Sequence, residues 1–412
     1  MSEEQAQQIG QRLRSARRQR GTSLRTLAEL AGLSVGFLSM VENGRRYLDR
    51  TGHINALAEA LKIAPSELTG RPYAPAAPTA ASAHEAIPTL RLALMGMNLG
   101  LPPDQRPPAG PVGLLAERVA EVNRLYHACE YGQVAEVLPG LLGDLHAAAD
   151  AAPGHRRQAL LRLLVDSYHP AGTLLLKNLG YTDLAFIAVT RAAEVIAELE
   201  DPIYQALSGF FHTHVLMAAG SPAQALARAG QAADEVERHL MSPAAHALLG
   251  ELHLIQATCL SLDVRRSGAE RTCEVNQHLA EAANLASRTG ETKAWHLNFG
   301  PTNVGIHQVS LNTDLGLHGK AVAAGAGVHP QTLAAPGREA AFRADLGRSL
   351  AHLRGRDTEA VASLLAAEHV APQRIHANVL VRETVSGLLD RQLPSHAARD
   401  LRGMAHRMGL QL

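Results

Sequence analysis

The feature that most constrains the fold is the order of helix-starting and helix-ending residues over 23–46. Ser23 is a good N-cap for a helix that Gly32 ends, and Ser34 is a good N-cap for a second helix that stops at Asn43. Apolar residues recur at helical spacing within both segments. Two short helices joined by a tight, glycine-containing turn predict a helix-turn-helix, whose second helix can enter the major groove of DNA.

Three further helical segments flank this motif. Apolar residues recur at helical spacing over 9–16 and 54–61, and Pro65 starts a last short turn. The front of the chain therefore predicts five helices and no strand. Residues 1–72 also hold 11 Lys and Arg against 7 Asp and Glu, although the whole chain has a formal net charge of zero. A basic front on a mildly acidic remainder indicates an anionic partner for the front.

The rest of the chain also predicts helices. Aromatic residues make up only 3% of the 412 residues, so Ala and Leu must fill the core, which suits closely packed helices. Residues 71–113 are rich in Pro and Ala, and we expect a linker followed by an irregular segment. From residue 114 onward, glycines recur roughly every 40 residues between amphipathic segments, as in helical-hairpin repeats. These glycines are Gly132, Gly180, Gly220, Gly268, Gly316 and Gly355.

The sequence thus predicts an all-α protein with a DNA-binding domain over 1–70, a linker over 71–113, and a tetratricopeptide-like helical-repeat solenoid over 114–412. An irregular α-helical domain is the alternative for the last part. Residues 9–69 resemble the Cro/CI-type (XRE-family) helix-turn-helix, which implies a five-helix lambda-repressor-like domain. The residues that carry this resemblance are Leu27-Ala28, Gly32, Leu33-Ser34, Leu38-Ser39, Val41-Glu42-Asn43-Gly44, Arg45-Arg46 and Leu57-Ala58-x-x-Leu61.

The resemblance implies a set of DNA contacts. The groove-facing positions are Ser34, Val35, Gly36, Ser39 and Met40, and the backbone-contacting positions are Ser23, Arg25, Asn43, Arg45 and Arg46. No groove-facing residue is a Gln, Asn or Arg that pairs with a base through two hydrogen bonds, so we expect modest base readout. Two heads on a long or symmetric operator would supply the remaining specificity. We therefore expect a homodimer assembled through the repeat domain.

A head of this type on a helical-repeat array resembles two groups of regulators. One group is the peptide-pheromone-sensing regulators of Gram-positive bacteria. The other comes from high-GC Gram-positive bacteria and shares a Gly-Arg-Pro-Tyr-like junction and a Phe-Gly-Pro-Thr-Asn-Val stretch, present here at 70–73 and 299–304. The first resemblance implies that the repeat domain senses a signal. The second covers most of the chain and informs the architecture more than the chemistry.

The most unusual stretch of the repeat domain is 295–307, which holds the single tryptophan, two histidines and two asparagines. Gly300-Pro301 breaks a helix in its middle and leaves the next helix N-terminus with free donors. We predict that ligand-contacting residues lie here, because Asn amides both donate and accept hydrogen bonds. They are Trp295, Asn298, Phe299, Asn303 and His307. The alternative is structural: Trp295 and Phe299 fill a core between repeats and Asn303 caps a helix.

Several classes of protein are disfavoured. Three scattered cysteines do not make a disulfide framework, and no apolar run reaches ~18 residues, so we expect a cytoplasmic protein with no membrane partner. The His-Glu-x-x-His and paired Cys-x-x-Cys patterns are absent, so we expect no metal site and no cofactor. Nucleotide-binding motifs are absent too, so we expect no enzymatic activity.

Together these patterns predict a sequence-specific DNA-binding transcriptional regulator. Its expected partners are a double-stranded DNA operator, a second copy of the chain, and a small-molecule or peptide signal that binds the repeat domain and modulates operator binding. The alternative is a protein–protein interaction scaffold, tethered to DNA by the head, with no small ligand. An enclosed, polar-lined cavity favours the sensor, and an open surface without a pocket favours the scaffold.

Overall fold

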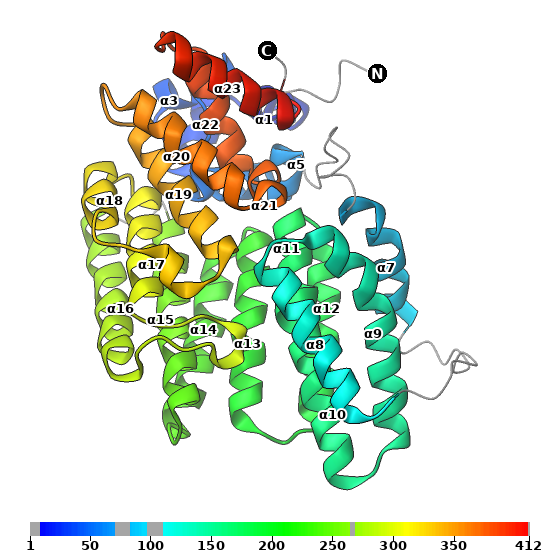
Figure 1. The fold of residues 1–412 in the computed structure, drawn as a ribbon. Coiled ribbons are helices and arrows are strands. Elements are labelled where there is room, and N and C mark those ends of the chain that lie inside the picture. The colour runs from blue at the N-terminus through cyan, green and yellow to red at the C-terminus, as the bar shows by residue number, and fades with distance from the viewer. Residues whose placement is uncertain (1–8, 71–82, 97–109, 264–267, 411–412) are drawn as a thin grey trace.

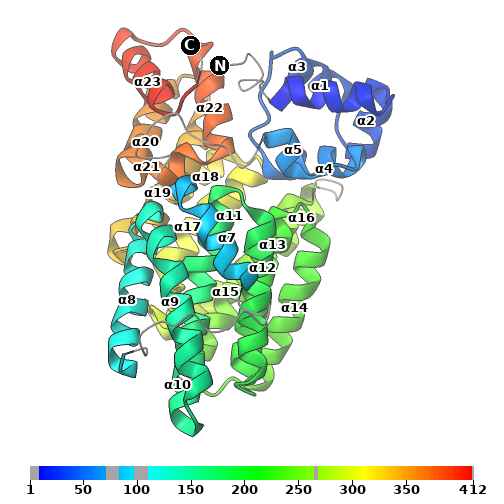
Figure 2. The same cartoon turned by 90° about the vertical axis from the view of Figure 1, so that its right-hand side faces the viewer.

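The chain folds almost entirely into helices. The computed structural model describes residues 9–70, 83–96, 110–263 and 268–410. These ranges contain no strand, and their one isolated β-bridge joins Thr292 to Phe299. The predicted all-α fold is confirmed. Five N-terminal helices form a small cluster of their own, here called the head (residues 9–70), and residues 83–410 form the body (Figures 1 and 2).

The head has the five helices that the sequence predicts. They are α1 (Ile9–Gln19), α2 (Leu24–Ala31), α3 (Val35–Glu42), α4 (Thr51–Leu61) and α5 (Pro65–Thr69). Both predicted caps are present, since Ser23 accepts a hydrogen bond from the Thr26 amide at 3.0 Å and Ser34 accepts one from the Phe37 amide at 3.1 Å. Gly32 ends α2 in the left-handed conformation, with φ of 67°, and so turns the chain into α3.

An apolar core and one ion pair hold the head together. Leu13, Leu27 and Leu38 are fully buried between α1, α2 and α3. Arg17 donates two hydrogen bonds to the Glu42 carboxylate, at 2.6 and 2.7 Å, and Glu42 is itself buried. These bonds raise the pKa of Arg17 and tie α1 to the C-terminal end of α3. The apolar core and this ion pair therefore both fix the position of α3.

The body is a series of helices in which chain neighbours pack against one another, as in helical hairpins (Figures 1 and 2). Its first part contains α7 (Ile87–Gly96), α8 (Val112–His127), α9 (Tyr131–Ala151), α10 (Gly154–Asp166), the π-helix η2 (Ser167–Leu174), α11 (Leu175–Leu179), α12 (Thr182–Ala197), α13 (Pro202–Ala218) and α14 (Pro222–Arg238). Its second part contains α15 (Pro243–Leu262), α16 (Gly268–Thr289), η3 (Ala294–His296), α17 (Pro301–Asp314), α18 (His318–Gly325), η4 (Pro330–Leu333), α19 (Pro336–Ala351), α20 (Asp357–Val370), α21 (Pro372–His376), α22 (Val379–Leu389) and α23 (Ser395–Arg407).

Four of the six glycines whose spacing predicted the repeat lie at helix ends. Gly180, Gly220, Gly316 and Gly355 lie in turns between helices and have positive φ. By contrast, Gly132 lies inside α9 and Gly268 starts α16. The helical-repeat-like body is confirmed, and its units are irregular.

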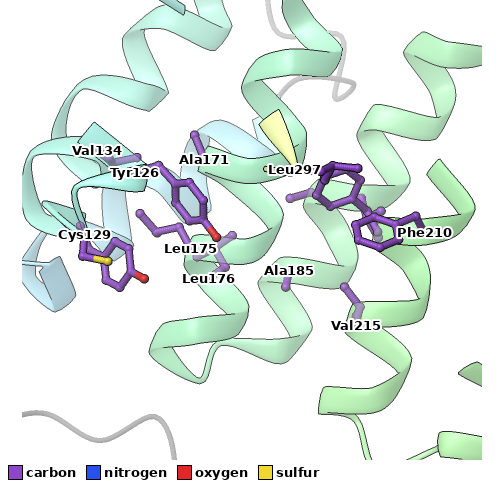
Figure 3. Packing of buried hydrophobic residues seen from close by; sticks show 14 of the residues in the cluster. Tyr126, Cys129, Val134, Ala171, Leu175, Leu176, Ala185, Phe210, Val215 and Leu297 are labelled. Atoms are coloured by element: carbon purple, nitrogen blue, oxygen red, sulfur yellow. The ribbon is translucent and has the colours of Figure 1, made fainter. Parts of the chain in front are cut away.

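Alanine and leucine fill the body core, as the composition predicts. Figure 3 shows Val134, Leu175, Leu176 and Ala185 packed between neighbouring helices. Five aromatic residues lie in the same interior and are among the largest fully buried side chains: Tyr131, Tyr168, Phe210, Phe211 and Phe299.

The interval 71–113 differs from the expectation. Residues 71–82 and 97–109 lie outside the described residues, but α7 is a regular helix that packs against α9 and α12. Its Ile87, Leu90 and Leu94 are buried. The expectation of an irregular segment does not hold for α7, because these three residues recur at helical spacing between the proline-rich stretches.

No single helix in the described ranges is both long and apolar enough to cross a membrane. Within the same ranges, only the pair α2 and α3 meets the length and composition criteria when joined, and these two helices are bent by 116° relative to each other.

Candidate DNA interface and ligand cavities

The second helix of the turn motif, α3, lies on the outer surface of the head, at the top of the view in Figure 2. Nine of the ten predicted DNA-contacting residues are exposed and Ser39 is half-buried; the exposed ones are Ser23, Arg25, Ser34, Val35, Gly36, Met40, Asn43, Arg45 and Arg46. The apolar side chains of Val35 and Met40 are 42% and 39% exposed. Apolar groups on a groove-facing helix suit contact with thymine methyl groups.

The loop after α3 presents cations beside this face. Arg45 and Arg46 are exposed, and the Arg46 guanidinium lies 5.1 Å from the centre of the Phe37 ring. This cation–π contact holds the charge close to α3. The Asn43 side-chain amide donates to the Ser39 carbonyl at 2.8 Å and closes the helix end. The arrangement of a helix flanked by fixed cations fits the backbone of a DNA duplex.

Another side of the head contacts the body, and three hydrogen bonds of this contact are here called the docking contacts. The Asp49 carboxylate pairs with His352, and the Asp49 carbonyl accepts a hydrogen bond from Arg348 at 2.6 Å. The Tyr47 hydroxyl donates to the Asp390 carboxylate at 2.6 Å. Since Tyr47 directly follows Arg45 and Arg46, its bond to Asp390 joins the loop after α3 to the body.

Charge stabilises the docking contacts. Burial on its own raises the pKa of Asp49, but the hydrogen bond with His352 and the charges of His352, Arg348 and Arg50 outweigh it and hold that pKa well below its usual range. Arg50 also lies 3.3 Å from the His318 ring, which stacks on His352 with ring centres 4.1 Å apart. Desolvation, followed by the charges of His352 and Arg50, lowers the pKa of His318 to about 4.

Helix α22 supplies a further contact. Its Glu383 is buried, and the carboxylate accepts hydrogen bonds from the backbone of Leu48 and Ile9 in the head. Desolvation raises the pKa of Glu383 to about 7. Val379 and Leu380, on the same helix, pack against the apolar core of the head. The body therefore binds the head through both apolar and polar groups.

A cavity of about 340 Å³, here called the junction cavity, lies between the head and the body. One wall comes from α4 and α5 of the head: Thr51, Ile54, Asn55, Pro65, Ser66 and Thr69. The other wall comes from the body and includes Lys177, Asn178, His214, Thr258, Asp314, Arg374, Asn378 and Leu380. A volume of this order is typical of small-molecule sites.

A second cavity of about 110 Å³, here called the basic cavity, lies within the body and shares four wall residues with the junction cavity. The shared residues are Lys177, Asn178, His214 and Arg374. The other walls are largely aromatic and basic, with Tyr126, His127, Tyr131, Phe210, His296 and Arg338. Tyr126 and Phe210 appear in Figure 3, where they belong to the same buried cluster.

Two of the five predicted ligand residues lie at or beside the basic cavity. Asn298 forms part of its wall. His307 lies behind this wall and contacts one of its residues, because the Arg338 guanidinium in the wall lies 3.4 Å from the His307 ring. Their role as ligand contacts stays a prediction.

Trp295 and Phe299 have structural contacts. Trp295 is half-buried, its indole N–H donates to the Ala244 carbonyl at 2.9 Å, and its ring packs edge-on against Tyr204. Phe299 is fully buried, and its ring occupies the space beside Gly250, where an added Cβ would lie only 2.0 Å from it. Glycine at position 250 is therefore required for this packing.

Asn303 is fully buried, and its side-chain amide bonds to another buried residue. Its Nδ2 donates to Glu251 Oε1 at 2.7 Å, and Glu251 is buried as well. Desolvation raises the pKa of Glu251 to about 7, while Arg338 and the bond from Asn303 act in the opposite direction. Neither cavity has Asn303 in its described wall. Its contacts fit the structural alternative better than the ligand-contact prediction, which stays a prediction.

The sequence did not point to the basic cavity. Lys177, His214, Arg338 and Arg374 come from α11, α13, α19 and α21, so no local pattern unites them. One signal was present: Lys177 is one of only four lysines in the chain and interrupts the apolar run of α11. A cation placed in a buried apolar stretch needs a partner or a function.

Comparisons with known proteins agree with this description of the head. Residues 8–69 match the model of a helix-turn-helix domain family. The curated proteins contain no significant match to the chain. Among solved structures, the chain is similar to Bacillus thuringiensis PlcR in complex with the peptide PapR7 and DNA, with 14% identity over 69% of this chain and 95% of that chain and a TM-score of 0.30. The domain match and the exposed basic face together support a DNA-binding regulator.

Proposed function

We propose that this chain is a sequence-specific transcriptional regulator in which a small-molecule or peptide signal controls operator binding from the junction cavity. The observation that carries this proposal is the origin of the cavity walls, one from the head and one from the body. A ligand in this cavity contacts both parts at once. The scaffold alternative has no use for a cavity with polar and apolar walls at this position.

The coupling follows from the docking contacts. A ligand shifts an equilibrium only through its different affinity for the two states. When the head leaves the body, only one wall of the junction cavity remains, so a ligand that contacts both walls binds the docked state more tightly. Docking fixes the direction in which α3 faces, and release of the docking contacts removes this constraint. The signal thereby changes operator affinity without touching DNA.

We further propose that the chain acts as a cytoplasmic, non-enzymatic homodimer assembled through the body. A single α3 has few side chains that specify bases, so two heads are needed. Their half-sites should be separated by about 34 Å or a multiple of this distance. Large exposed apolar side chains of the body support such a contact. Leu92, Val137 and Phe186 lie on α7, α9 and α12 and are 70%, 44% and 52% exposed, and α7 packs against both of the other helices.

The DNA-binding part is tested by selecting operators from random DNA with the full chain and then measuring affinity against salt. Arg45→Ala with Arg46→Ala should weaken binding to every sequence and lower the salt slope by ~0.9 for each phosphate that these arginines no longer neutralise. Arg399→Ala with Arg402→Ala removes the same charge from the exposed face of α23 and should change neither quantity. Equal behaviour of the two double variants would place the DNA interface elsewhere.

The signal is tested by mass spectrometry of small molecules that co-purify with the full chain. A bound compound should be released on denaturation, and adding it back should change the operator affinity. A compound that binds without changing the operator affinity would refute the regulatory part of the proposal.

A further inference from the structure

We infer that the basic cavity binds the acid group of a small organic acid, and that the rest of this ligand reaches the junction cavity. This inference rests on the proposed function, because it names the chemical class of the signal. The two cavities share walls, so one ligand can occupy both.

The walls of the basic cavity carry positive charge. Lys177, Arg338 and Arg374 line this cavity, and no Asp or Glu is among its described wall residues. The side chains that meet the two guanidinium groups at hydrogen-bond distance are neutral: Arg338 lies 3.4 Å from the His307 ring, and Arg374 donates to the Tyr131 hydroxyl at 3.4 Å. Both distances are long for a hydrogen bond. Guanidinium groups in such surroundings bind carboxylates strongly, because a planar fork of donors matches two oxygens.

A buried ring nitrogen lies at the same place. His214 Nδ1 is buried and has no hydrogen-bond partner among the described residues. Burial, followed by the charges of Lys177, Arg338, His307 and Arg374, lowers the pKa of His214 well below its usual value. The ring is therefore neutral, and in the tautomer that carries the proton on Nδ1 it can donate this N–H to an oxyanion. Two kinds of donor thus converge where the two cavities meet.

The acid nearest to Arg338 does not cancel the charge of the cavity. Glu251 lies close enough to Arg338 for that charge to lower its pKa, but Glu251 is not part of the cavity wall. It bonds to Asn303 and its pKa is about 7, so near neutral pH it is only partly ionised. The cavity therefore stays positively charged.

The shape and lining of the cavity suit an organic acid. The Tyr126 and Tyr131 rings stack with centres 6.0 Å apart, and Phe210 belongs to the same lining. These walls fit a ring or short hydrocarbon next to the acid group. A volume of about 110 Å³ holds an acid group with a few carbons, and a larger ligand extends past His214 and Arg374 into the junction cavity.

The test uses the full chain with phenylacetate and its neutral analogue phenylacetamide as probes. Isothermal titration gives both affinities, and the single tryptophan, Trp295, reports binding by fluorescence because it lies three residues before the wall residue Asn298. We expect phenylacetate to bind at least about tenfold more tightly than phenylacetamide, a difference of ~1.4 kcal/mol. Equal affinities, or no binding of phenylacetate, would overturn the inference.

Variants locate the site. Arg338→Gln and Arg374→Gln should each remove most of the preference for the acid, and Arg338→Lys should keep part of it because the charge stays. Arg343→Gln is the matched control, since Arg343 lies on the same helix α19, pairs with Glu339 and is absent from the cavity wall. If phenylacetate binds both Gln variants as well as the wild type, the acid binds elsewhere and the inference is wrong. The acid-to-amide comparison on the wild type needs no variant to fold.

Operator titration separates this inference from the proposed function. If phenylacetate binds with the expected preference but leaves operator affinity unchanged, the ligand class stands and the regulation fails. If a neutral co-purified compound changes operator affinity and the acid shows no preference, the regulation stands and the ligand class fails.

Discussion

Replacement of Asn303 by alanine distinguishes a core residue from a ligand contact. Asn303 is 0% exposed, and its side-chain hydrogen bond, 2.7 Å long, goes to the equally buried Glu251. Removing it leaves the Glu251 carboxyl without that donor, which costs about 1–3 kcal/mol of unfolding free energy. We expect a reduction of about 2 kcal/mol.

This reduction should depend on pH, and the sign follows from Glu251. The pKa of its carboxyl is raised from 4.5 to about 7 in the folded protein. The contribution of such a carboxyl to the free energy of unfolding is fully present below the pKa that it has in the unfolded chain. This contribution declines as pH rises through the pKa in the folded protein, by about 3 kcal/mol in total. Because Asn303 donates to the charged form, Asn303→Ala should cost more at pH 8 than at pH 5.5.

Urea unfolding followed by Trp295 fluorescence at these two pH values measures the effect. Glu251→Gln is the control, since it keeps an acceptor for Asn303 and removes the titrating group. A structural role for Asn303 is refuted if Asn303→Ala leaves stability unchanged at both pH values and instead abolishes the response of operator binding to a co-purified signal. That result would establish Asn303 as a ligand contact.

Two further predictions concern the contacts of the body. As pH rises through about 7, docking of the head should weaken, because docking buries Glu383 and raises its pKa. The facing charges of Asp49 and Arg12 act on this pKa with opposite signs. Amide hydrogen exchange in the head measures docking, and Glu383→Gln should abolish its pH dependence. The prediction is contradicted if the wild-type head exchanges equally at pH 6 and 8 after correction for the intrinsic exchange rate. Separately, Leu92→Asp with Phe186→Asp should shift the full chain from dimer to monomer in sedimentation, and a dimer that persists would exclude this face.

The head could be predicted from the sequence because its determinants are local. Ser23 and Ser34 cap helices through amides three residues away, and Gly32 turns the chain between them. The exposure of Val35 and Met40 also follows from helical periodicity, since the apolar positions on the opposite face of α3 form the core.

The cavities could not be predicted, because they depend on packing between distant parts of the chain. Lys177 and Arg374 are almost two hundred residues apart and meet only when α11 lies near α21. The stretch 295–307 is unusual in composition, but periodicity does not show that Phe299 fills the space beside Gly250 or that Asn303 bonds to Glu251. Such contacts are decided by tertiary structure.

The most direct test of the central claim is the operator affinity of a variant whose head is loosened from the body. Tyr47→Phe with His352→Ala removes two docking contacts, of about 1 kcal/mol each, and leaves α3 intact. If docking sets the placement of two heads on one operator, the second head of this variant binds from a lower effective concentration. Anisotropy titration should then show the operator affinity of the variant weakened by about fivefold or more. An unchanged operator affinity, with the variant folded and dimeric, would contradict the claim that the body controls DNA binding through the docked head.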